Sequence, residues 1–380
     1  MIKLQSRISR SLFCGLCFAV VWICLLLVAG PSGGDEWEQA TSSSRSWRFP
    51  RDHGSHPGYR TEWWYFTGNM ADAKGNRYGY QLTFFRQGMR NRNPDPGNAW
   101  SVRDLYLAHF AITDVAKKRF FTEERASRTG PGLAGASTER LEVRLLDWQA
   151  RQEKDTIFLS AGSDAMGLSL RLKPSKPPVM HGTNGLSRKG PQEGQASYYV
   201  SYTSLATTGS LKVPETPDPI QVKGVSWFDH EFGSNQLTRD QAGWDWFSLH
   251  LSDGKDLMIY LLRRTDGTVE PASSGTIVDR QGTSRHVTLS HIQLEVLDHW
   301  KSPRSNASYP TKWRIRVPSE GLDLLISPLL ADQELTTEGS TGVTYWEGAV
   351  EGRGTSGGQK VTCEGYVEMT GYAGKLGGLF

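Results

Sequence analysis

The chain has 380 residues, enough for two or three average domains, with 11% aromatic residues, 41 glycines and only 22% charged residues. This composition is too aromatic for a disordered chain and too rich in glycine for a helical bundle, so it predicts a folded, turn-rich protein dominated by β-strands. The formal net charge of +3 comes entirely from residues 1–34, which carry three basic and no acidic residues. The rest of the chain is neutral overall, which argues against a nucleic-acid-binding protein.

Residues 1–34 have the pattern of an export segment. Lys3, Arg7 and Arg10 precede an uncharged apolar run at residues 11–29, an order that places the body of the chain outside the cytoplasm. The run is long for a signal peptide and just long enough to span a bilayer, so a cleaved signal peptide and a retained anchor both remain open. We therefore expect a periplasmic or extracellular protein, or one anchored to the membrane by residues 11–29.

The cysteines do not predict a disulfide. Three of the four lie inside the apolar run, and Cys363 is the fourth. A mature chain without the run would hold a single cysteine, so it could form no intrachain disulfide.

Beyond the export segment, residues 35–47 are polar and rich in serine, which is typical of a linker. From residue 61 onward, short runs rich in Trp, Tyr, Phe, Val and Thr alternate with turn residues, several of them with the two-residue period of a strand. The clearest runs are residues 63–66, 78–85, 105–112, 157–160, 168–172 and 198–203. This spacing predicts antiparallel sandwiches or barrels and no βαβ units.

The strand pattern repeats once over a long period. Residues 63–70 resemble residues 244–251, and residues 224–233 align with residues 365–374 glycine to glycine. Two diverged copies of one β unit follow from this repeat. We expect an N-terminal barrel at residues 48–235 and a C-terminal barrel at residues 236–380.

No strong catalytic motif stands out in the sequence. It has no His-Glu-x-x-His pair and no Walker loop, which argues against a zinc peptidase and an NTPase. Residues 354–358 match the Gly-x-Ser-x-Gly spacing, but they lie between two short predicted strands, as a hairpin loop would, with no following helix, so we expect no classical serine hydrolase. What remains are two polar and aromatic clusters, at residues 52–64 and at residues 227–233, the second followed by Trp244-Asp245-Trp246.

Three interpretations of these clusters stay open. Their histidines and Trp side chains could serve the barrel structure alone. His53, His56 and His230 could bind a metal together with Glu62 or Glu231, although we expect neither a metal nor a cofactor. The clusters could also line an apolar cavity in which a few buried polar groups orient a ligand or move a proton.

The same segments resemble a known family. Residues 59–68, 80–86, 224–233 and 243–247 are similar to the AttH/CrtC-type lipocalin-like family over roughly residues 48–376. The resemblance implies an all-β chain of two lipocalin-like (calycin) antiparallel barrels in tandem. The family includes exported bacterial proteins labelled secreted hydrolases and the carotenoid 1,2-hydratases (hydroxyneurosporene synthases), and it is related to fungal cyclases of polyenes. Their common theme is a long apolar ligand.

For a hydratase, the resemblance implies a definable chemistry. A protonated carboxyl group would protonate an alkene, aromatic faces would stabilise the cation, and a held water would capture it. Asp229 and Asp245 are the candidate acids, and His230 is the candidate that orients the water. The candidate ligand-binding residues are Glu62, Trp63, Trp64, Trp227, Trp244 and Trp246.

These observations lead to one main hypothesis and two alternatives. The main hypothesis is an exported protein that binds an apolar or amphipathic small molecule, a lipid or an isoprenoid, at the bacterial cell envelope. The first alternative is a hydro-lyase or cyclase that acts on an unsaturated isoprenoid by aspartate acid catalysis. The second is an attachment or structural protein of the envelope. The sequence gives neither the ligand nor the oligomeric state.

Overall fold

The computed structural model describes residues 37–90, 101–216, 218–235, 237–238 and 240–374. The predicted export segment, residues 1–34, lies outside this set. The described residues belong to one compact unit. None of the helices in this part of the chain is long and apolar enough to cross a membrane.

The first half of the chain builds one antiparallel sheet, in the order β4-β3-β2-β1-β13-β12-β9-β8-β7-β6-β5, with β10 and β11 paired to β12. Its strands are β1 (Thr61–Ala71), β2 (Arg77–Gly88), β3 (Asp104–Asp114), β4 (Arg119–Arg128), β5 (Ala134–Ala136), β6 (Glu142–Leu145), β7 (Trp148–Glu153), β8 (Thr156–Gly162), β9 (Gly167–Pro174), β10 (Val179–Met180), β11 (Leu186–Arg188), β12 (Ala196–Lys212) and β13 (Ile220–Gly233).

The second half builds another antiparallel sheet, in the order β17-β16-β15-β14-β23-β22-β20-β19-β18, with β21 paired to β22. Its strands are β14 (Gln241–Leu251), β15 (Asp256–Arg264), β16 (Ser274–Val278), β17 (Ser284–Thr288), β18 (Gln293–Lys301), β19 (Ser308–Val317), β20 (Leu322–Pro328), β21 (Glu334–Thr336), β22 (Thr344–Ser356) and β23 (Gln359–Met369). The helices of the described chain are short 3-10 turns, η1 (Arg51–His53), η2 (Leu289–His291) and η3 (Pro318–Glu320).

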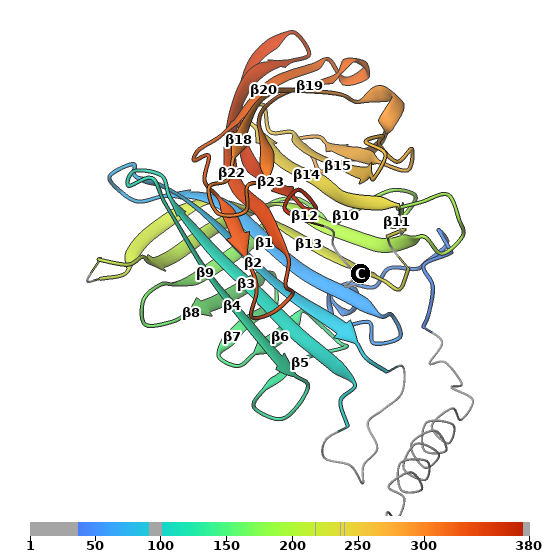
Figure 1. Cartoon of the computed structure of the whole chain (residues 1–380), viewed down its shortest axis with the longest axis vertical. Helices are drawn as coiled ribbons and strands as arrows, with labels where there is room; N and C mark the ends of the chain where they lie inside the picture. The colour runs from blue at the N-terminus through green and yellow to red at the C-terminus, as the bar shows by residue number, and fades with distance from the viewer. Residues whose placement is uncertain (1–36, 91–100, 217, 236, 239, 375–380) are drawn as a thin grey trace, which may run out of the picture. The chain divides into compact units, whose positions relative to one another are not determined.

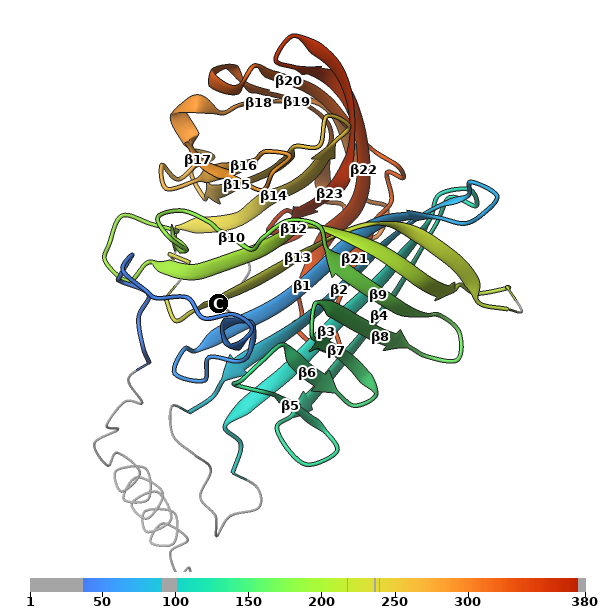
Figure 2. The same ribbon diagram turned by 180° about the vertical axis from the view of Figure 1, so that it is seen from behind.

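Each sheet curls into a near-barrel, which confirms the predicted all-β tandem fold (Figure 1). The run of strands from β4 to β7 in the first sheet has the same order as the run from β17 to β18 in the second sheet. In this match β1 is equivalent to β14, and β13 is equivalent to β23. Viewed from behind, strands β12 and β13 of the first sheet lie beside β14 of the second (Figure 2).

The strand pairing corrects the register of the predicted repeat. Tyr65 lies opposite Asp229 across β1 and β13, while Trp246, the repeat equivalent of Tyr65, lies opposite Glu368 across β14 and β23. The glycine-to-glycine alignment would have matched Asp229 with Thr370, two residues further on. The repeat therefore equates Asp229 with Glu368.

Three apolar clusters hold the fold together. The interior of the first near-barrel is filled by its own side chains, among them Trp64, Phe66 and Trp148, and the interior of the second is filled by a separate set that includes Trp313. A third cluster lies between the two sheets and is rich in aromatic residues: Tyr65, Tyr199, Trp227, Trp246, Met258, Tyr260, Leu262, Ala349 and Tyr366. Since successive strand residues face opposite sides of a sheet, each central strand contributes to its own barrel and to this shared layer.

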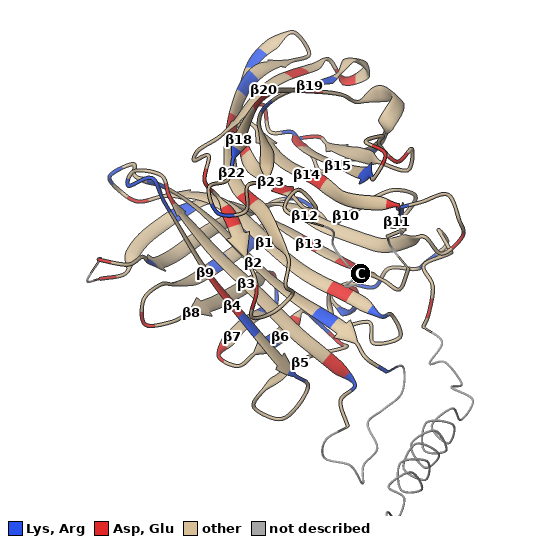
Figure 3. Cartoon of the chain, viewed as in Figure 1, with Lys and Arg blue, Asp and Glu red and all other residues tan. Residues whose placement is uncertain are grey.

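The segment expected to be a linker packs on the first sheet from residue 37 onward. Ala40 is buried with Tyr198 and Phe232, and Trp47 packs against this cluster. Arg45 lies over the Tyr198 ring, 4.9 Å from its centroid. Charged residues of both signs are spread over both sheets (Figure 3), in keeping with the balance of charges in residues 35–380.

Candidate functional site

A cavity opens between the two sheets, on the outer face of both near-barrels. Its lining residues come from β1, β2, β3, β12, β13, β14, β15, β22 and β23 and from three connecting segments: Trp63, Tyr65, Thr83, Phe85, His109, Lys189, Tyr199, Asp229, Glu231, Leu237, Trp244, Trp246, Tyr260, Leu262, Thr341, Val343, Tyr345, Glu368 and Thr370. The cavity volume open to the centre of a water-sized sphere is about 100 Å³. Most of the lining is aromatic or aliphatic, and its few polar groups include three carboxyl groups.

Asp229 is the carboxyl group that β13 presents to the cavity. It accepts hydrogen bonds from the Tyr199 hydroxyl and from Trp227 Nε1, both at 2.5 Å, and from the Ser201 hydroxyl. Trp246 Nε1 in turn donates to the Tyr199 hydroxyl at 3.0 Å. Burial raises the pKa of Asp229 to about 7, although the three donors favour the ionised form. A carboxyl group with this pKa can give and take a proton at neutral pH.

Glu368 is the equivalent carboxyl group of the second sheet. Trp244 Nε1 donates a hydrogen bond to Glu368 Oε2 at 2.8 Å. Burial, with the charge of Asp229 adding to it, raises the pKa of Glu368 to about 7 as well. The two copies of the repeat thus each place one acid with a shifted pKa at the same cavity.

A fourth carboxyl group, Glu347 on β22, lies behind the cavity wall. The Tyr65 hydroxyl donates to Glu347 Oε1 at 2.7 Å, and Glu347 lies directly opposite Glu368 in the β22–β23 register. Burial and the charge of Glu368 raise the pKa of Glu347 well above its ordinary value. This shift favours the neutral form of Glu347.

The segment between β9 and β12 contributes the one lysine of the lining. Lys189 Nζ lies 2.9 Å from Glu231 Oε1 and 4.2 Å from the centre of the Tyr260 ring. Burial alone would lower the pKa of Lys189, but the charge of Glu231 outweighs it and raises that pKa. Lys189 therefore carries its positive charge beside Glu231, and both residues are almost fully buried.

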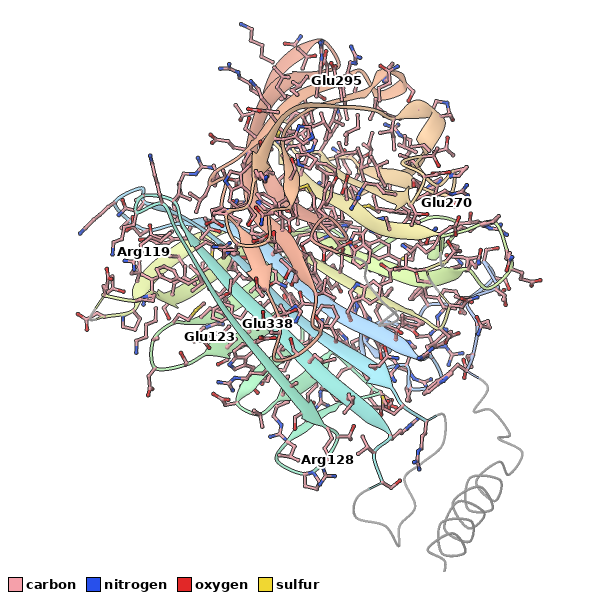
Figure 4. The ribbon with its side chains drawn as sticks, viewed as in Figure 1. Arg119, Glu123, Arg128, Glu270, Glu295 and Glu338 are labelled. Carbon is pink, nitrogen blue, oxygen red and sulfur yellow. The ribbon has the colours of Figure 1, made fainter. Side chains whose placement is uncertain are left out.

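A loop of the second sheet covers part of the cavity and contacts the first sheet. Gly339 N donates to Glu124 Oε1 at 2.9 Å, and the Ser340 hydroxyl donates to the other oxygen of Glu124. Glu338, at the start of this contact, lies over the strands of the first sheet in Figure 4. Val343, further along the loop, lines the cavity.

His109 on β3 is held by the same loop. Its Nδ1 lies 2.8 Å from the Tyr345 hydroxyl and its Nε2 lies 3.0 Å from Ser340 Oγ. Burial lowers the pKa of His109 to about 3, so the ring is neutral and acts as a hydrogen-bonding group.

The structure brings together about half of the predicted site residues. Trp63, Trp244, Trp246 and Asp229 line the cavity, and Trp227 supports Asp229 from within the shared aromatic layer.

The other predicted site residues lie elsewhere. Glu62, Trp64 and His230 face the interior side of the first sheet, where Trp64 stacks on His230 at 5.1 Å between ring centroids. Asp245 faces the interior side of the second sheet, where its carboxylate binds Arg263 Nε at 3.0 Å and accepts a bond from the Tyr372 hydroxyl at 3.1 Å. Strand alternation is the reason, because Asp229 and His230 are neighbours in sequence and so point to opposite faces.

Several residues that line the cavity were not predicted from the sequence, chiefly Glu368, Tyr199, Lys189 and His109. Each is a single residue in an ordinary strand or loop and carries no local motif. Glu368 alone had an available signal, since the repeat in its observed register places it at the position of Asp229.

The comparisons with known proteins agree on family and fold. The AttH-like family model matches residues 40–372. A crystal structure of a protein assigned as AttH from Nitrosomonas europaea is 33% identical, with a TM-score of 0.78, and the match covers 87% of this chain and 99% of that one. Kievitone hydratase from Nectria haematococca is 16% identical, with a TM-score of 0.66 over 90% of this chain and 97% of that one, and it shares the fold.

No curated protein matches the sequence. The family model spans nearly all of the described chain, and the Nitrosomonas protein shares a third of its residues over almost its whole length. The chain therefore belongs to the AttH-like family.

Proposed function

We propose that the protein binds an apolar or amphipathic small molecule in the cavity between its two sheets. The observation that carries the proposal is the lining itself, a mainly aromatic and aliphatic wall with a few convergent polar groups, which is the usual character of a small-molecule site. The interiors of both near-barrels are packed with their own side chains, so the ligand sits between the barrels and not inside one of them.

The polar groups suggest how such a molecule would be oriented. A neutral Asp229 or Glu368 can donate a hydrogen bond to a hydroxyl or carbonyl oxygen, and the tryptophan and tyrosine rings around them offer flat apolar surfaces. A lipid or isoprenoid with one oxygen function fits this pattern. Export by residues 1–34 would bring the protein to the cell envelope, where such molecules are abundant.

Native mass spectrometry of the purified chain tests the proposal without a guess at the ligand. The chain would be purified without detergent, and native and denaturing spectra would be compared while an organic extract is analysed for lipids and isoprenoids. We expect an apolar adduct at one molecule per chain. A spectrum of the bare chain, with no compound in the extract and no binding of added lipids, would contradict the proposal.

A blocking variant shows whether the adduct occupies this cavity. Val343→Trp adds bulk at a partly exposed loop position of the lining and should abolish the adduct. Val296→Trp is the matched control, because Val296 is an exposed valine outside the lining. Equal adduct in both variants would place the ligand elsewhere.

A specific observation favours a second function, acid chemistry of the hydratase type. Two carboxyl groups with pKa values of about 7 face one aromatic cavity, and such perturbed groups in a cavity are characteristic of catalytic acids and bases. The fold shared with a protein named as a hydratase is consistent with this second candidate.

Hydration of an alkene in this cavity would use Asp229 as the acid. The neutral Asp229 carboxyl group gives its proton to one alkene carbon, and the other carbon becomes a cation that the aromatic faces stabilise. A water oxygen then bonds to that cation, and the water's extra proton returns to the Asp229 carboxylate, either directly or by way of an ionised Glu368. The product is an alcohol, and the protein returns to its starting protonation.

Turnover of the co-purified class of compound separates the two functions. Asp229→Asn should keep the ligand and lower turnover by roughly 10²–10⁴-fold, the usual contribution of general acid catalysis. Asp245→Asn is the matched control, since Asp245 lies outside the cavity. An Asp229→Asn variant with undiminished turnover would exclude Asp229 as the acid.

A further inference from the structure

A second cluster of titratable side chains lies on the opposite side of β1 and β13 from the cavity. His56, in the segment before β1, Glu62 on β1 and His230 on β13 place one ligand atom each within 4.8 Å of one another. Both imidazoles converge on the same oxygen, with His56 Nδ1 at 3.0 Å and His230 Nε2 at 2.9 Å from Glu62 Oε1. The side chains of Glu62 and His230 are fully buried, and that of His56 is 13% exposed.

In each ring the outer nitrogen, the one that points away from Glu62, lies near an oxygen of Asp52. His230 Nδ1 lies 3.1 Å from the backbone oxygen of Asp52, which can only accept a hydrogen bond, so Nδ1 carries the proton. His56 Nε2 lies 3.3 Å from Oδ1 of the same Asp52. If each outer nitrogen donates to Asp52, each inner nitrogen presents a lone pair to Glu62 Oε1.

In this tautomer two imidazole lone pairs and a carboxylate oxygen point at one another, and a cation between them would satisfy all three. The opposite oxygen, Glu62 Oε2, is already held at 2.9 Å by both Arg86 Nε and the Ser55 hydroxyl, so the carboxylate is fixed with Oε1 turned toward the rings. Metal-binding histidines are commonly oriented in this way, with the outer N–H given to a carbonyl or carboxylate.

We propose that His56, Glu62 and His230 form a site for a divalent transition-metal ion, with zinc as the best fit. Two imidazoles and one carboxylate are a common zinc ligand set, at metal–ligand distances of about 2.0–2.2 Å. Ligands around such an ion are roughly 3.4 Å apart, so the observed 2.9 and 3.0 Å need to open by only a few tenths of an ångström.

Position in the fold indicates what the metal would do. Asp52, Ser55 and His56 line a surface hollow, which gives an ion access from solvent and leaves room for a water as fourth ligand. The site would tie the segment before β1 to the two central strands of the first sheet. The metal therefore acts as a structural clamp, separate from the cavity between the sheets.

Zinc titration of the full chain tests the assignment. The chain is stripped with a chelator, and binding of ZnCl₂ is followed by calorimetry and by metal analysis after gel filtration. We expect one zinc per chain, a higher melting temperature with zinc, and the visible absorption of tetrahedral Co²⁺ when cobalt replaces it. His56→Ala should weaken zinc binding roughly a hundredfold or more, since loss of a ligand exceeds the effect of losing its outer partner.

His250→Ala is the matched control, because His250 is equally exposed and also bonds a carboxylate, Asp256, at 2.9 Å. Its zinc binding should equal that of the unaltered chain. Because the His56 side chain is partly exposed, we expect His56→Ala to fold. Its melting temperature in chelator, compared with that of the unaltered chain, checks this. Failure of the unaltered chain to bind one zinc, or equal binding by His56→Ala, would overturn the proposal.

Discussion

Replacing Asp229 by Asn should change the pH dependence of stability in a calculable way. Burial raises the pKa of Asp229 from its ordinary value of 3.8 to about 7. Between these values the native state holds a proton that the unfolded chain has released, so the free energy of unfolding falls as pH rises. At ~1.4 kcal/mol per pH unit, this single group lowers stability by ~4 kcal/mol from pH 4 to pH 8.

Asn cannot titrate, so the variant lacks this contribution at every pH. Its amide changes the hydrogen bonds to Tyr199, Ser201 and Trp227, which shifts stability by an amount that does not depend on pH. It also removes a charge that helps to raise the pKa of Glu368, which makes a smaller pH-dependent contribution. The quantity to measure is therefore the difference between the unaltered chain and Asp229→Asn as a function of pH. From pH 5 to pH 8 this difference should decline by ~3 kcal/mol and level off above pH 7.

Urea unfolding followed by tryptophan fluorescence at four pH values supplies the data, with equal m-values as the check that both proteins unfold alike. Asp164→Asn, at an exposed aspartate, is the control and should track the unaltered chain. A flat difference curve for Asp229→Asn would mean that its three donors keep the carboxylate ionised. The assignment of Asp229 as a proton donor near neutral pH would then be refuted.

Two further predictions concern stability. Lys189→Met leaves Glu231 buried without its cation and should lower the free energy of unfolding in urea by ~3–5 kcal/mol. Adding Glu231→Gln should recover most of this loss. A loss below ~1 kcal/mol in the single variant would show that the carboxylate is solvated or neutral. Gly79→Ala would place a methyl group 2.6 Å from the Tyr366 hydroxyl oxygen, at the contact between the sheets. This clash should lower the free energy of unfolding by ~1–3 kcal/mol. An unchanged melting temperature would show that the two sheets can separate slightly at no cost.

Much of the fold follows from sequence because its signals are local and repeated. The two-residue alternation in segments such as residues 78–85 marks strands, and all six predicted runs fall within strands of the structure. The similarity of residues 63–70 to residues 244–251 predicted two like units, and β1 and β14 hold equivalent places in their sheets.

The candidate site was less predictable because its position depends on which face of each strand meets the other sheet. Asp229 and His230 are adjacent in sequence, yet one lines the cavity and the other lies in the His56–Glu62–His230 cluster. A pattern of alternation gives the two faces of a strand but not which of them is covered by a second sheet. Glu368 was missed because alignment by glycines displaced the second copy by two residues.

A crystal structure of the chain purified without detergent would show whether the cavity between the sheets is a ligand site. We expect elongated density for an apolar molecule in contact with Trp246 and Tyr260, with its polar end within hydrogen-bonding distance of Asp229 or Glu368. Density inside either near-barrel, or a cavity that holds only ordered water after soaking with the extracted compound, would contradict the claim.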